Sequence, residues 1–472
     1  MKISDYVINT LAAEGVTHIF EICGGALGHL LDSLYGRTDI RTVSMHHEMA
    51  AAIAAEGYAR AGETIGVAMA TSGPGATNLI TGIGSCYFDS IPCVFITGQV
   101  NTYEFKFGKP VRQIGFQETD IVNIVKPIVK AAVLISDPLD TQKILERSII
   151  IAKTGRPGPV LIDIPLDIQR LTIEPTTHST GEFPSPDFVV PDDTLIGQIR
   201  SLIECASRPL ILAGGGVRSS KATRDLFDFV HTHNIPVVVS LMGLDSFPHD
   251  DQRYIGMIGT YGNRYANLAI ANADLIIALG TRFDTRQTGT KPETFARAAK
   301  IIHVDIDAHE LNSKIKADLP INMDVRTFLG ILNLNSSNFA RKNYSSWFEW
   351  IRQCKMKYSE NCNNNQKTIS PYNFLRGVSE ALPEEAIICA DVGQNQMWAA
   401  QIIEVKKDQR FLTQGGMASI GSALPMAIGA AFAKPHTMVI VITGDGGFQL
   451  NSQELQTVYH HNLPLKIIKS DW

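Results

Sequence analysis

The chain has 472 residues, 44% hydrophobic and 19% charged, a length that allows about two to four domains and a composition typical of a globular enzyme. Its net charge of −5, without a long cluster of Lys and Arg, argues against nucleic-acid binding, and no apolar run is long enough to span a membrane. Seven cysteines without Cys-x-x-Cys spacing indicate reduced thiols, and the amino terminus has no signal-peptide profile, so we expect a cytoplasmic protein.

The first block of the chain, residues 1–172, alternates helical and strand-like runs. We predict helices at 3–13, 47–61 and 75–85, and strands at 42–44, 65–70, 93–97 and 160–164. Such alternation is typical of a parallel sheet covered by helices. A polar stretch rich in Pro, Ser and Thr, residues 174–193, follows as a predicted linker.

The second block, residues 192–332, repeats this rhythm, with strands predicted at 209–213, 236–240, 274–279 and 300–305. A second polar stretch, residues 333–370, marks the next boundary. Within it, the aromatic cluster Trp347-Phe348-Glu349-Trp350 predicts a helix that docks on a neighbour.

The third block, residues 370–472, contains predicted strands at 386–391, 438–443 and 463–468 and a predicted helix at 424–433. Asn451 and Glu454 are interpreted as a capping pair that opens a helix at 452–461. The block is short for a complete α/β domain. The expected fold class is therefore α/β, with three doubly wound parallel-sheet domains, the third of them incomplete.

Three segments carry candidate chemistry. Asp445, in Gly444-Asp445-Gly446-Gly447, could hold a metal and the diphosphate that it neutralises, or could be a turn residue bonded to its own backbone. Glu48 could be a first-turn acid favoured by the helix dipole, or a buried carboxylate that protonates a heterocyclic nitrogen. The turn at residues 71–78 could supply polar contacts from Thr77 and Asn78, or could simply connect a strand to a helix.

A fourth candidate is the glycine-rich segment at residues 415–421. Its glycines could serve close packing of a helix on a sheet. Alternatively, its bulky apolar side chains could form a wedge held against a bound ring.

Taken together, these motifs resemble one family. They stand in the order found in thiamine-diphosphate enzymes, and most of all in the large subunit of acetolactate (acetohydroxyacid) synthase. The residues that carry the resemblance are Glu48, Gly73-Pro74-Gly75-Ala76-Thr77-Asn78, Gly393-Gln394-Asn395-Gln396-Met397-Trp398, Gly444-Asp445-Gly446, Arg156-Pro157-Gly158-Pro159 and Leu161-Ile162-Asp163-Ile164-Pro165.

The resemblance implies a first domain that binds the pyrimidine of thiamine diphosphate, a central domain like the family's FAD-binding domain, and a third that binds the diphosphate. Glu48 would then bind the pyrimidine nitrogen, Ile420 would be the wedge and Asp445 would bind Mg²⁺. Phe116, Gln117 and Lys130 match positions near the substrate in the family; without the resemblance they would be ordinary loop and helix-surface residues.

The remaining cofactor residues that the resemblance implies fall into two groups. Those for thiamine diphosphate are Gly25, Pro74, Asn78, Gln394, Gln396, Met397, Gly416, Gly444, Gly446 and Gly447. Those for the flavin region are Gly214, Gly215, Gly280, Arg282 and Asp305. For Arg282, the alternative to binding the acceptor carboxylate is a structural ion pair with Asp284 or Asp305.

The implied reaction is decarboxylation of a 2-keto acid, pyruvate, followed by carboligation to a second 2-keto acid, as in branched-chain amino acid biosynthesis. Its cofactors would be thiamine diphosphate, Mg²⁺ and FAD. We expect a homodimer or homotetramer, with a possible regulatory small subunit as partner. Two other functions stay open, another thiamine-diphosphate decarboxylase or lyase and a catalytically impaired truncated homologue.

The sequence departs from the family pattern in three places. Cys23 stands where the family has proline, and Thr285 where it commonly has a second aspartate. The family's second metal ligand is an asparagine, whose Asn-Asn pair would fall at Asp471-Trp472. We therefore expect a chain that is truncated before the family's carboxy-terminal lid.

Overall fold

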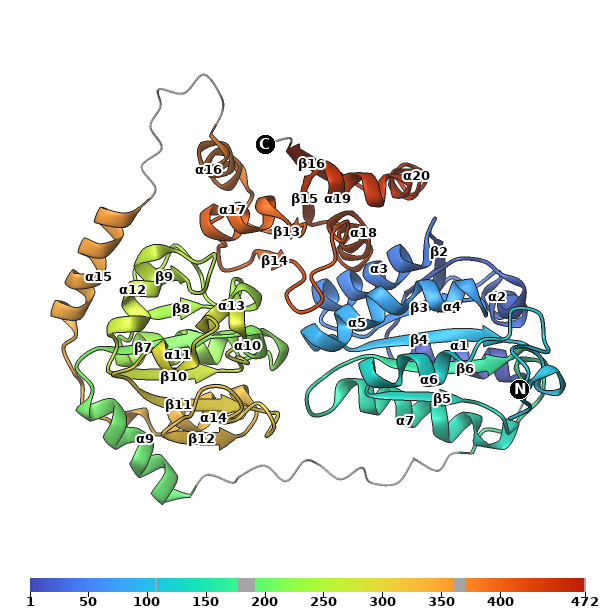
Figure 1. Cartoon of the computed structure of the whole chain (residues 1–472), viewed down its shortest axis with the longest axis horizontal. Helices are drawn as coiled ribbons and strands as arrows, with labels where there is room; N and C mark the ends of the chain where they lie inside the picture. Colours follow the sequence, from blue (N-terminus) through green and yellow to red (C-terminus); the bar gives the residue numbers. More distant parts are fainter. Residues whose placement is uncertain (107, 177–191, 360–369, 471–472) are drawn as a thin grey trace. The chain divides into compact units, whose positions relative to one another are not determined.

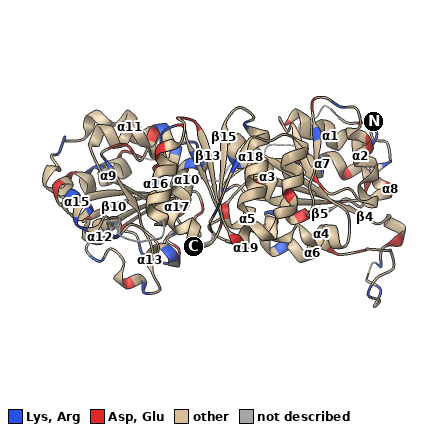
Figure 2. Ribbon diagram, turned by 90° about the horizontal axis from the view of Figure 1, so that it is seen from above, with Lys and Arg blue, Asp and Glu red and all other residues tan. Residues whose placement is uncertain are grey.

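The computed structural model describes residues 1–106, 108–176, 192–359 and 370–470, which form three sheets flanked by helices (Figure 1). The chain divides into two compact units. One contains the amino-terminal sheet with residues 386–393 and 412–470, and the other contains the central sheet with residues 394–411. Among the described residues, no helix is long and apolar enough to cross a membrane. Lys and Arg are interspersed with Asp and Glu along the ribbon (Figure 2).

The amino-terminal sheet has six strands in the order β2-β1-β3-β4-β6-β5, and its described pairings are all parallel. The strands are β1 (His18–Glu21), β2 (Arg41–Ser44), β3 (Gly66–Ala70), β4 (Cys93–Gln99), β5 (Ala131–Leu134) and β6 (Val160–Pro165). The helices are α1 (Ile3–Ala13), α2 (Gly28–Leu34), α3 (Glu48–Gly62), α4 (Pro74–Asn78), α5 (Ile80–Asp89), α6 (Ile121–Val125), α7 (Thr141–Lys153) and α8 (Leu166–Gln169).

Both faces of this sheet are buried, because successive side chains of a strand point to opposite faces. In β3, Val67 and Met69 join a core cluster with residues of α1, α2 and α7, whereas Ala68 and Ala70 join another with residues of α3 and α5. The continuous apolar strands predicted from the sequence follow from this burial on two faces. The helix predicted at 75–85 is divided into α4 and α5 at Leu79.

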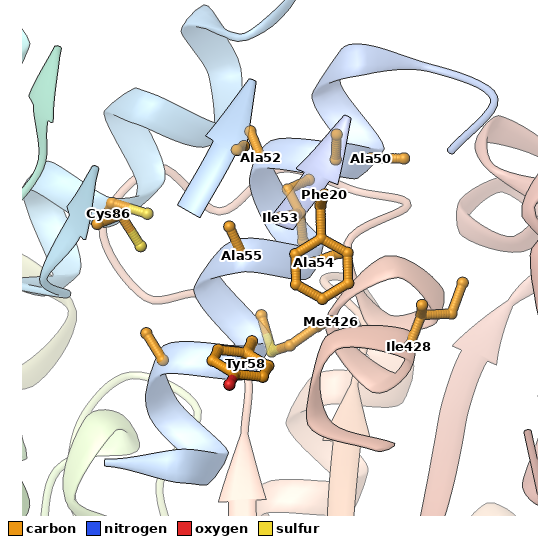
Figure 3. Packing of buried hydrophobic residues seen from close by; sticks show 14 of the residues in the cluster. Phe20, Ala50, Ala52, Ile53, Ala54, Ala55, Tyr58, Cys86, Met426 and Ile428 are labelled. Atoms are coloured by element: carbon orange, nitrogen blue, oxygen red, sulfur yellow. The ribbon is translucent and has the colours of Figure 1, made fainter. Parts of the chain in front are cut away.

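Helix α3 also packs against α18 (Ala423–Ala433), and Figure 3 shows Met426 of α18 beside Tyr58 of α3. The two backbones approach closely. A Cβ atom at Gly429 would lie 1.8 Å from the carbonyl oxygen of Ala54. Glycine is therefore required at this crossing because any side chain would overlap the facing helix.

The central sheet has six strands in the order β12-β11-β10-β7-β8-β9, again parallel in every described pairing. Its strands are β7 (Pro209–Ala213), β8 (Val237–Val239), β9 (Tyr254–Met257), β10 (Leu275–Leu279), β11 (Lys300–Asp305) and β12 (Leu319–Asn322). The helices of this part are α9 (Asp193–Cys205), α10 (Gly215–Ser219), α11 (Thr223–His233), α12 (Arg264–Asn272), α13 (Thr285–Thr288), α14 (Val325–Leu334) and α15 (Ser345–Tyr358).

The aromatic cluster forms a docked helix, as predicted. Trp347 lies in α15, is buried, and donates a 3.0 Å hydrogen bond from Nε1 to the carbonyl oxygen of Pro209. The predicted linker at 174–193 lies largely outside the described residues, and so do residues 360–369 of the second polar stretch.

The third sheet has four strands in the order β14-β13-β15-β16. Its strands are β13 (Ala386–Ala390), β14 (Arg410–Leu412), β15 (Met438–Gly444) and β16 (Leu465–Ser470). The helices of this part, besides α18, are α16 (Pro371–Ala381), α17 (Gln394–Ile402), α19 (Asp445–Leu450) and α20 (Leu455–His460), with the 3-10 helix η8 (Ser452–Glu454) before α20. The expected α/β class with three parallel sheets is confirmed.

The capping pair predicted at the start of the helix at 452–461 is wrong. The structure has η8 and α20 there, and Asn451 makes no side-chain capping bond. Instead, Nδ2 of Asn451 donates to the carbonyl oxygen of Gly421, at 2.7 Å, and Oε1 of Glu454 accepts the backbone N–H of His46, at 2.9 Å. Both side chains serve contacts distant in sequence, which a local capping pattern cannot reveal.

Candidate functional site

Two loops meet at the carboxyl edge of the amino-terminal sheet. One follows β2 and leads to Glu48, the first residue of α3, and the other follows β3 and leads to Pro74, the first residue of α4. Because these strands are parallel, both loops emerge on the same edge, where α/β sheets bind their ligands. Nδ2 of Asn78 donates a 2.9 Å hydrogen bond to Oε2 of Glu48. The sequence prediction had named Glu48, Pro74 and Asn78, and the structure brings these residues together.

Helix α3 starts at Glu48 because His47 caps it. His47 has extended backbone, and its Nδ1 accepts the backbone N–H of Met49 at 3.0 Å. The Glu48 carboxylate is half-buried at the positive end of the helix dipole, and its Oε1 accepts no hydrogen bond from any residue that the structure describes. One oxygen of Glu48 is thus held while the other is available to a ligand.

Two further predicted residues lie close to this edge. The segment that contains Gly25 contacts Thr71, whose Oγ1 accepts the N–H of Ala26 at 3.3 Å. Gln117 has a positive φ of 66° and packs over Gly73, where an added Cβ atom would lie 2.9 Å from Cβ of Gln117. The neighbouring Phe116 is 84% exposed.

Lys130 lies elsewhere. It precedes β5, and its N–H donates to the carbonyl oxygen of Pro159, so it lies at the amino edge of the sheet, opposite the edge with Glu48. Its ammonium donates to the carbonyl oxygens of Ile151 and, at 2.6 Å, of Thr154. Burial lowers the pKa of Lys130 to about 8. Within this chain, Lys130 is not brought to the edge that holds Glu48.

Strand β15 ends in the glycine-rich turn that carries Asp445. The Asp445 carboxylate is exposed at the first position of α19, and it makes no hydrogen bond or ion pair with any other described residue. Gly446 is exposed, and a Cβ atom there would meet no other atom within 4 Å. An unpaired carboxylate beside open backbone suits a hard cation and a phosphate better than it suits a self-bonded turn.

The glycine-rich segment before α18 contains Gly416 and Ile420. Both oxygens of Asp89 accept backbone N–H groups from this segment, Oδ2 from Gly415 at 2.9 Å and Oδ1 from Gly416 at 2.7 Å. Ile420 is 48% exposed although the next residue, Gly421, is buried. An apolar side chain is therefore held outward from an ordered turn.

Helix α17 carries three more predicted cofactor residues. It begins at Gln394, which is exposed, whereas Gln396 is buried and Met397 is half-buried. The expected second metal ligand at Asp471-Trp472 lies outside the described residues.

The predicted flavin residues meet in the central sheet. Its strand order, taken from the other edge, is β9-β8-β7-β10-β11-β12, which is the 3-2-1-4-5-6 order of dinucleotide-binding folds. Gly214 and Gly215 follow β7, Gly280 follows β10, and Asp305 ends β11. The N–H of Gly216 donates to the carbonyl oxygen of Gly280 at 3.0 Å, so the loops touch where the strand order reverses.

Arg282 is half-buried in the loop after β10 and makes no ion pair with any residue in the described ranges. The alternative of an ion pair with Asp284 is wrong. Asp284 caps α13, where its Oδ1 accepts the N–H groups of Arg286 and Gln287 at 2.8 and 3.3 Å. No ion pair joins Arg282 to Asp305 either among the described residues, so the guanidinium is available to an anion.

The sequence did not single out a buried network around Glu56. Its Oε1 lies 3.3 Å from Nη1 of Arg60, and its Oε2 accepts from Oγ of Ser85 at 2.7 Å and from Nε2 of Gln414 at 3.0 Å. Burial raises the pKa of Glu56 to about 7, although Arg60 acts in the opposite direction. An acidic residue within an alanine-rich helix could have indicated this buried carboxylate in the sequence, because such a helix is buried on most sides.

A second carboxylate that the sequence did not indicate as functional is Asp391, which directly follows β13. It is 1% exposed, and it accepts hydrogen bonds from the turn after Ile420 and from Thr443 of β15. The sequence offers no local signal for these contacts because the partners lie about thirty and fifty positions away.

Comparison with known proteins identifies the family. Three family models match: "Thiamine pyrophosphate enzyme, N-terminal TPP binding domain" at residues 1–124, the corresponding central domain at 196–332, and the corresponding C-terminal TPP binding domain at 391–471. Acetolactate synthase 1, chloroplastic, of Nicotiana tabacum is 40% identical over 476 residues, which cover 99% of this chain and 70% of the tobacco protein.

Microbial relatives match over a similar length. The probable acetolactate synthase large subunit of Methanocaldococcus jannaschii is 40% identical, with 99% of this chain and 79% of that protein covered. The acetolactate synthase large subunit of Lactococcus lactis is 37% identical, with coverage of 98% and 80%. The family expected from the motifs is thereby confirmed: this chain belongs to the acetolactate synthase family of thiamine-pyrophosphate enzymes.

Proposed function

We propose that the protein is a thiamine-diphosphate- and Mg²⁺-dependent carboligase of the acetolactate synthase type, which decarboxylates pyruvate and joins the two-carbon unit to a second 2-keto acid. The observation that carries the proposal is the half-bonded Glu48 carboxylate at the carboxyl edge of a sheet that matches a thiamine-pyrophosphate-binding domain. Bound thiamine diphosphate supplies the carbon nucleophile and the electron sink for this chemistry.

Glu48 fits the pyrimidine end of the cofactor. Asn78 fixes one carboxylate oxygen, so the other can exchange a proton with a ring nitrogen in a defined direction. Glycine at position 75 keeps this approach open, because a Cβ atom there would lie 3.4 Å from Oε1 of Glu48. Gly25, Pro74 and Gln117 border the same edge and would limit the access of water.

Asp445 fits the diphosphate end. It is an exposed oxygen donor beside Gly446, and Gly444 precedes it at the end of β15, so backbone can approach phosphate oxygens. Mg²⁺ held by Asp445 would neutralise the diphosphate. Ile420 would support the bound rings from the neighbouring turn, and Gly416 and Gly447 would approach the cofactor with their backbone. For Gln394, Gln396 and Met397 of α17, a cofactor contact is proposed from the family resemblance alone.

FAD is the proposed ligand of the central sheet. Its dinucleotide-fold strand order and the touching loops at Gly214–Gly216 and Gly280 leave backbone rather than side chains at the switch point. The guanidinium of Arg282 has no partner there among the residues that the structure describes, which suits a phosphate of the flavin or the carboxylate of the acceptor keto acid.

The proposal includes a homodimer or homotetramer. Phe116 and Ile420 are both exposed in the single chain, and burial of such apolar groups against a second copy would exclude water from the reacting carbon. In such an assembly Phe116, Gln117 and Lys130 would border the substrate. A regulatory small subunit is a further proposed partner, since two relatives are named large subunits. The described free cysteines suit a reducing compartment, for which we propose the cytoplasm.

Product analysis with pyruvate tests the proposal. The purified chain is incubated with pyruvate, thiamine diphosphate and Mg²⁺, and acetolactate and acetaldehyde are quantified separately. Acetolactate formation that depends on thiamine diphosphate supports the proposal. Acetaldehyde without acetolactate would instead indicate a decarboxylase, and cofactor binding without turnover would indicate a catalytically impaired homologue.

A further inference from the structure

We propose that Asp391 is a positioning residue that fixes the turn after Ile420 and joins it to the turn of Asp445. This inference rests on the proposed function, in which Ile420 and Asp445 face the cofactor. Asp391 itself is 1% exposed, so it acts through the backbone that it holds and does not touch the substrate.

The Asp391 carboxylate gathers hydrogen bonds from two separate segments. Oδ1 accepts the N–H groups of Gly421, at 3.0 Å, and Ser422, at 3.1 Å, together with its neighbour Val392, at 2.8 Å. Oδ2 accepts from Oγ1 of Thr443 at 2.9 Å. Because donors from both segments converge on one buried carboxylate, this side chain fixes the turn.

The turn is held from its other side by Asn451. Nδ2 of Asn451 donates to the carbonyl oxygen of Gly421 at 2.7 Å, so both peptide groups that flank this glycine are bonded to buried side chains. Gly421 has a φ of 83°, and a Cβ atom there would lie 2.8 Å from Cβ of Leu450. The turn can therefore take this path only with glycine at position 421.

The residue before Ile420 is also anchored. Oε1 of Gln414 accepts both the N–H of Ser419, at 3.0 Å, and its Oγ, at 2.6 Å, and Gln414 in turn donates to the buried Glu56. Ile420 thus stands between two bonded residues while its own side chain stays 48% exposed. Such an arrangement fixes the direction of an apolar side chain without burying it.

The same carboxylate reaches the turn that carries Asp445. Thr443, bonded to Asp391, lies two positions before Asp445, and a Cβ atom at Gly447 would lie only 2.0 Å from Oδ2 of Asp391. Any movement of Asp391 would therefore displace both turns. Asp391 thus links the two turns, and the fit of one cofactor to both would depend on this link.

The test measures the turn directly, without cofactor, by hydrogen–deuterium exchange in the full chain. Asp391→Ala should raise exchange at residues 421–422 by about tenfold, because their acceptor is removed. Asp391→Asn keeps one acceptor oxygen and should give an intermediate rate. The matched control is Asp274→Asn, which alters a carboxylate that accepts the N–H groups of Ser207 and Arg208 in the central part.

Steady-state kinetics of the same variants distinguish a positioning role of Asp391 from a general loss of stability. Asp391→Ala should lower kcat by about tenfold to a hundredfold with little change in KM for pyruvate, and Asp391→Asn should rescue part of the loss. Asp274→Asn should change neither kcat nor the exchange at 421–422. If the Ala variant does not fold, hydrogen–deuterium exchange at residues 421–422 and kcat are measured in Asp391→Asn and Asn451→Ala instead.

Unchanged exchange at 421–422 in folded Asp391 variants would overturn the inference, as would an equal fall in kcat in the Asp274 control. If the unaltered chain makes no acetolactate, the proposed function fails. The exchange measurement still decides whether Asp391 fixes the turn.

Discussion

The two regions that we propose to face the cofactor differ in how their residues are held. At the amino-terminal edge, the motif residues contact one another, since Asn78 donates directly to Glu48. At the carboxy-terminal turns, Asp445 and Ile420 are exposed, and the residues that fix their backbone lie beneath them. A motif can thus name the groups that meet the ligand and still miss the groups that position them.

The largest expected effect on activity is at Glu48, a motif residue that we propose to contact the cofactor itself. Glu48→Gln removes the proton exchange with a ring nitrogen, so we expect acetolactate formation to fall by about 10²–10⁴-fold. The amide still fits beside Asn78, so the midpoint of urea unfolding should stay close to that of the unaltered chain. The exposed Glu384→Gln serves as control for both measurements. Retention of activity by Glu48→Gln would remove the amino-terminal region from the mechanism.

The next largest expected effect is on stability, at the crossing of α3 with α18. Helix α3 begins at Glu48, and α18 follows the turn after Ile420. Gly429→Ala places a Cβ atom 1.8 Å from the carbonyl oxygen of Ala54. The overlap should cost about 3 kcal/mol of unfolding free energy, measured by urea denaturation. The control is Gly330→Ala in α14, where an added Cβ atom meets nothing within 4 Å. This variant should raise the unfolding free energy slightly, because alanine favours a helix more than glycine does. Equal stability of the two variants would contradict this helix contact.

The amino-terminal region has its own buried carboxylate, Asp163, which accepts from Thr97 and Gln99 at 2.7 and 2.9 Å. Burial raises its pKa from 3.8 to about 7. Between these values the folded chain keeps a proton that the unfolded chain has lost, so stability falls as pH rises.

Asp163→Asn lacks this titration and retains only a pH-independent cost from mismatched hydrogen bonds. Its unfolding free energy relative to the unaltered chain should therefore improve by about 2–3 kcal/mol between pH 4.5 and 7. Urea unfolding across that range measures the change, with Asp274→Asn as control. A difference that does not vary with pH would show that Asp163 is ionised throughout.

The smallest expected effect is at the Ile420 side chain, which the carboxy-terminal turns hold outward. Ile420→Ala should lower kcat by about tenfold, whereas Ile420→Met keeps an apolar side chain of similar size and should retain most of the activity. The half-exposed side chain contributes little to the core, so the unfolding midpoint should change little. Steady-state kinetics with pyruvate measures the effect, and equal kcat in the Ala variant would exclude a supporting role.

The sequence predicted most of the fold where strands are buried on both faces, as in β3, β4, β10 and β15. Five strands were not indicated, and four of them, β5, β9, β12 and β14, lie at sheet edges. Edge strands are short and partly exposed, so they lack the continuous apolar run that marks a central strand. The fifth, β1, lies inside the sheet but spans only four residues, His18–Glu21, with polar ends.

The same distinction applies to the site. The positions of Glu48, Asn78 and the flavin-region glycines after strand ends could be predicted, because each stands in a short pattern that follows an apolar run. Asp391 and the true partners of Asn451 and Glu454 could not, because their hydrogen bonds join segments far apart in sequence. Such contacts depend on the packing of whole elements, which local spacing does not encode.

Carboligation of two keto acids on thiamine diphosphate can be measured with ¹³C-labelled pyruvate, whose products are followed by NMR. We expect one acetolactate for each CO₂ released, only when thiamine diphosphate and Mg²⁺ are present, and almost none with Glu48→Gln. Release of CO₂ with acetaldehyde and no acetolactate, or product formation that is unaffected by Glu48→Gln, would contradict this expectation.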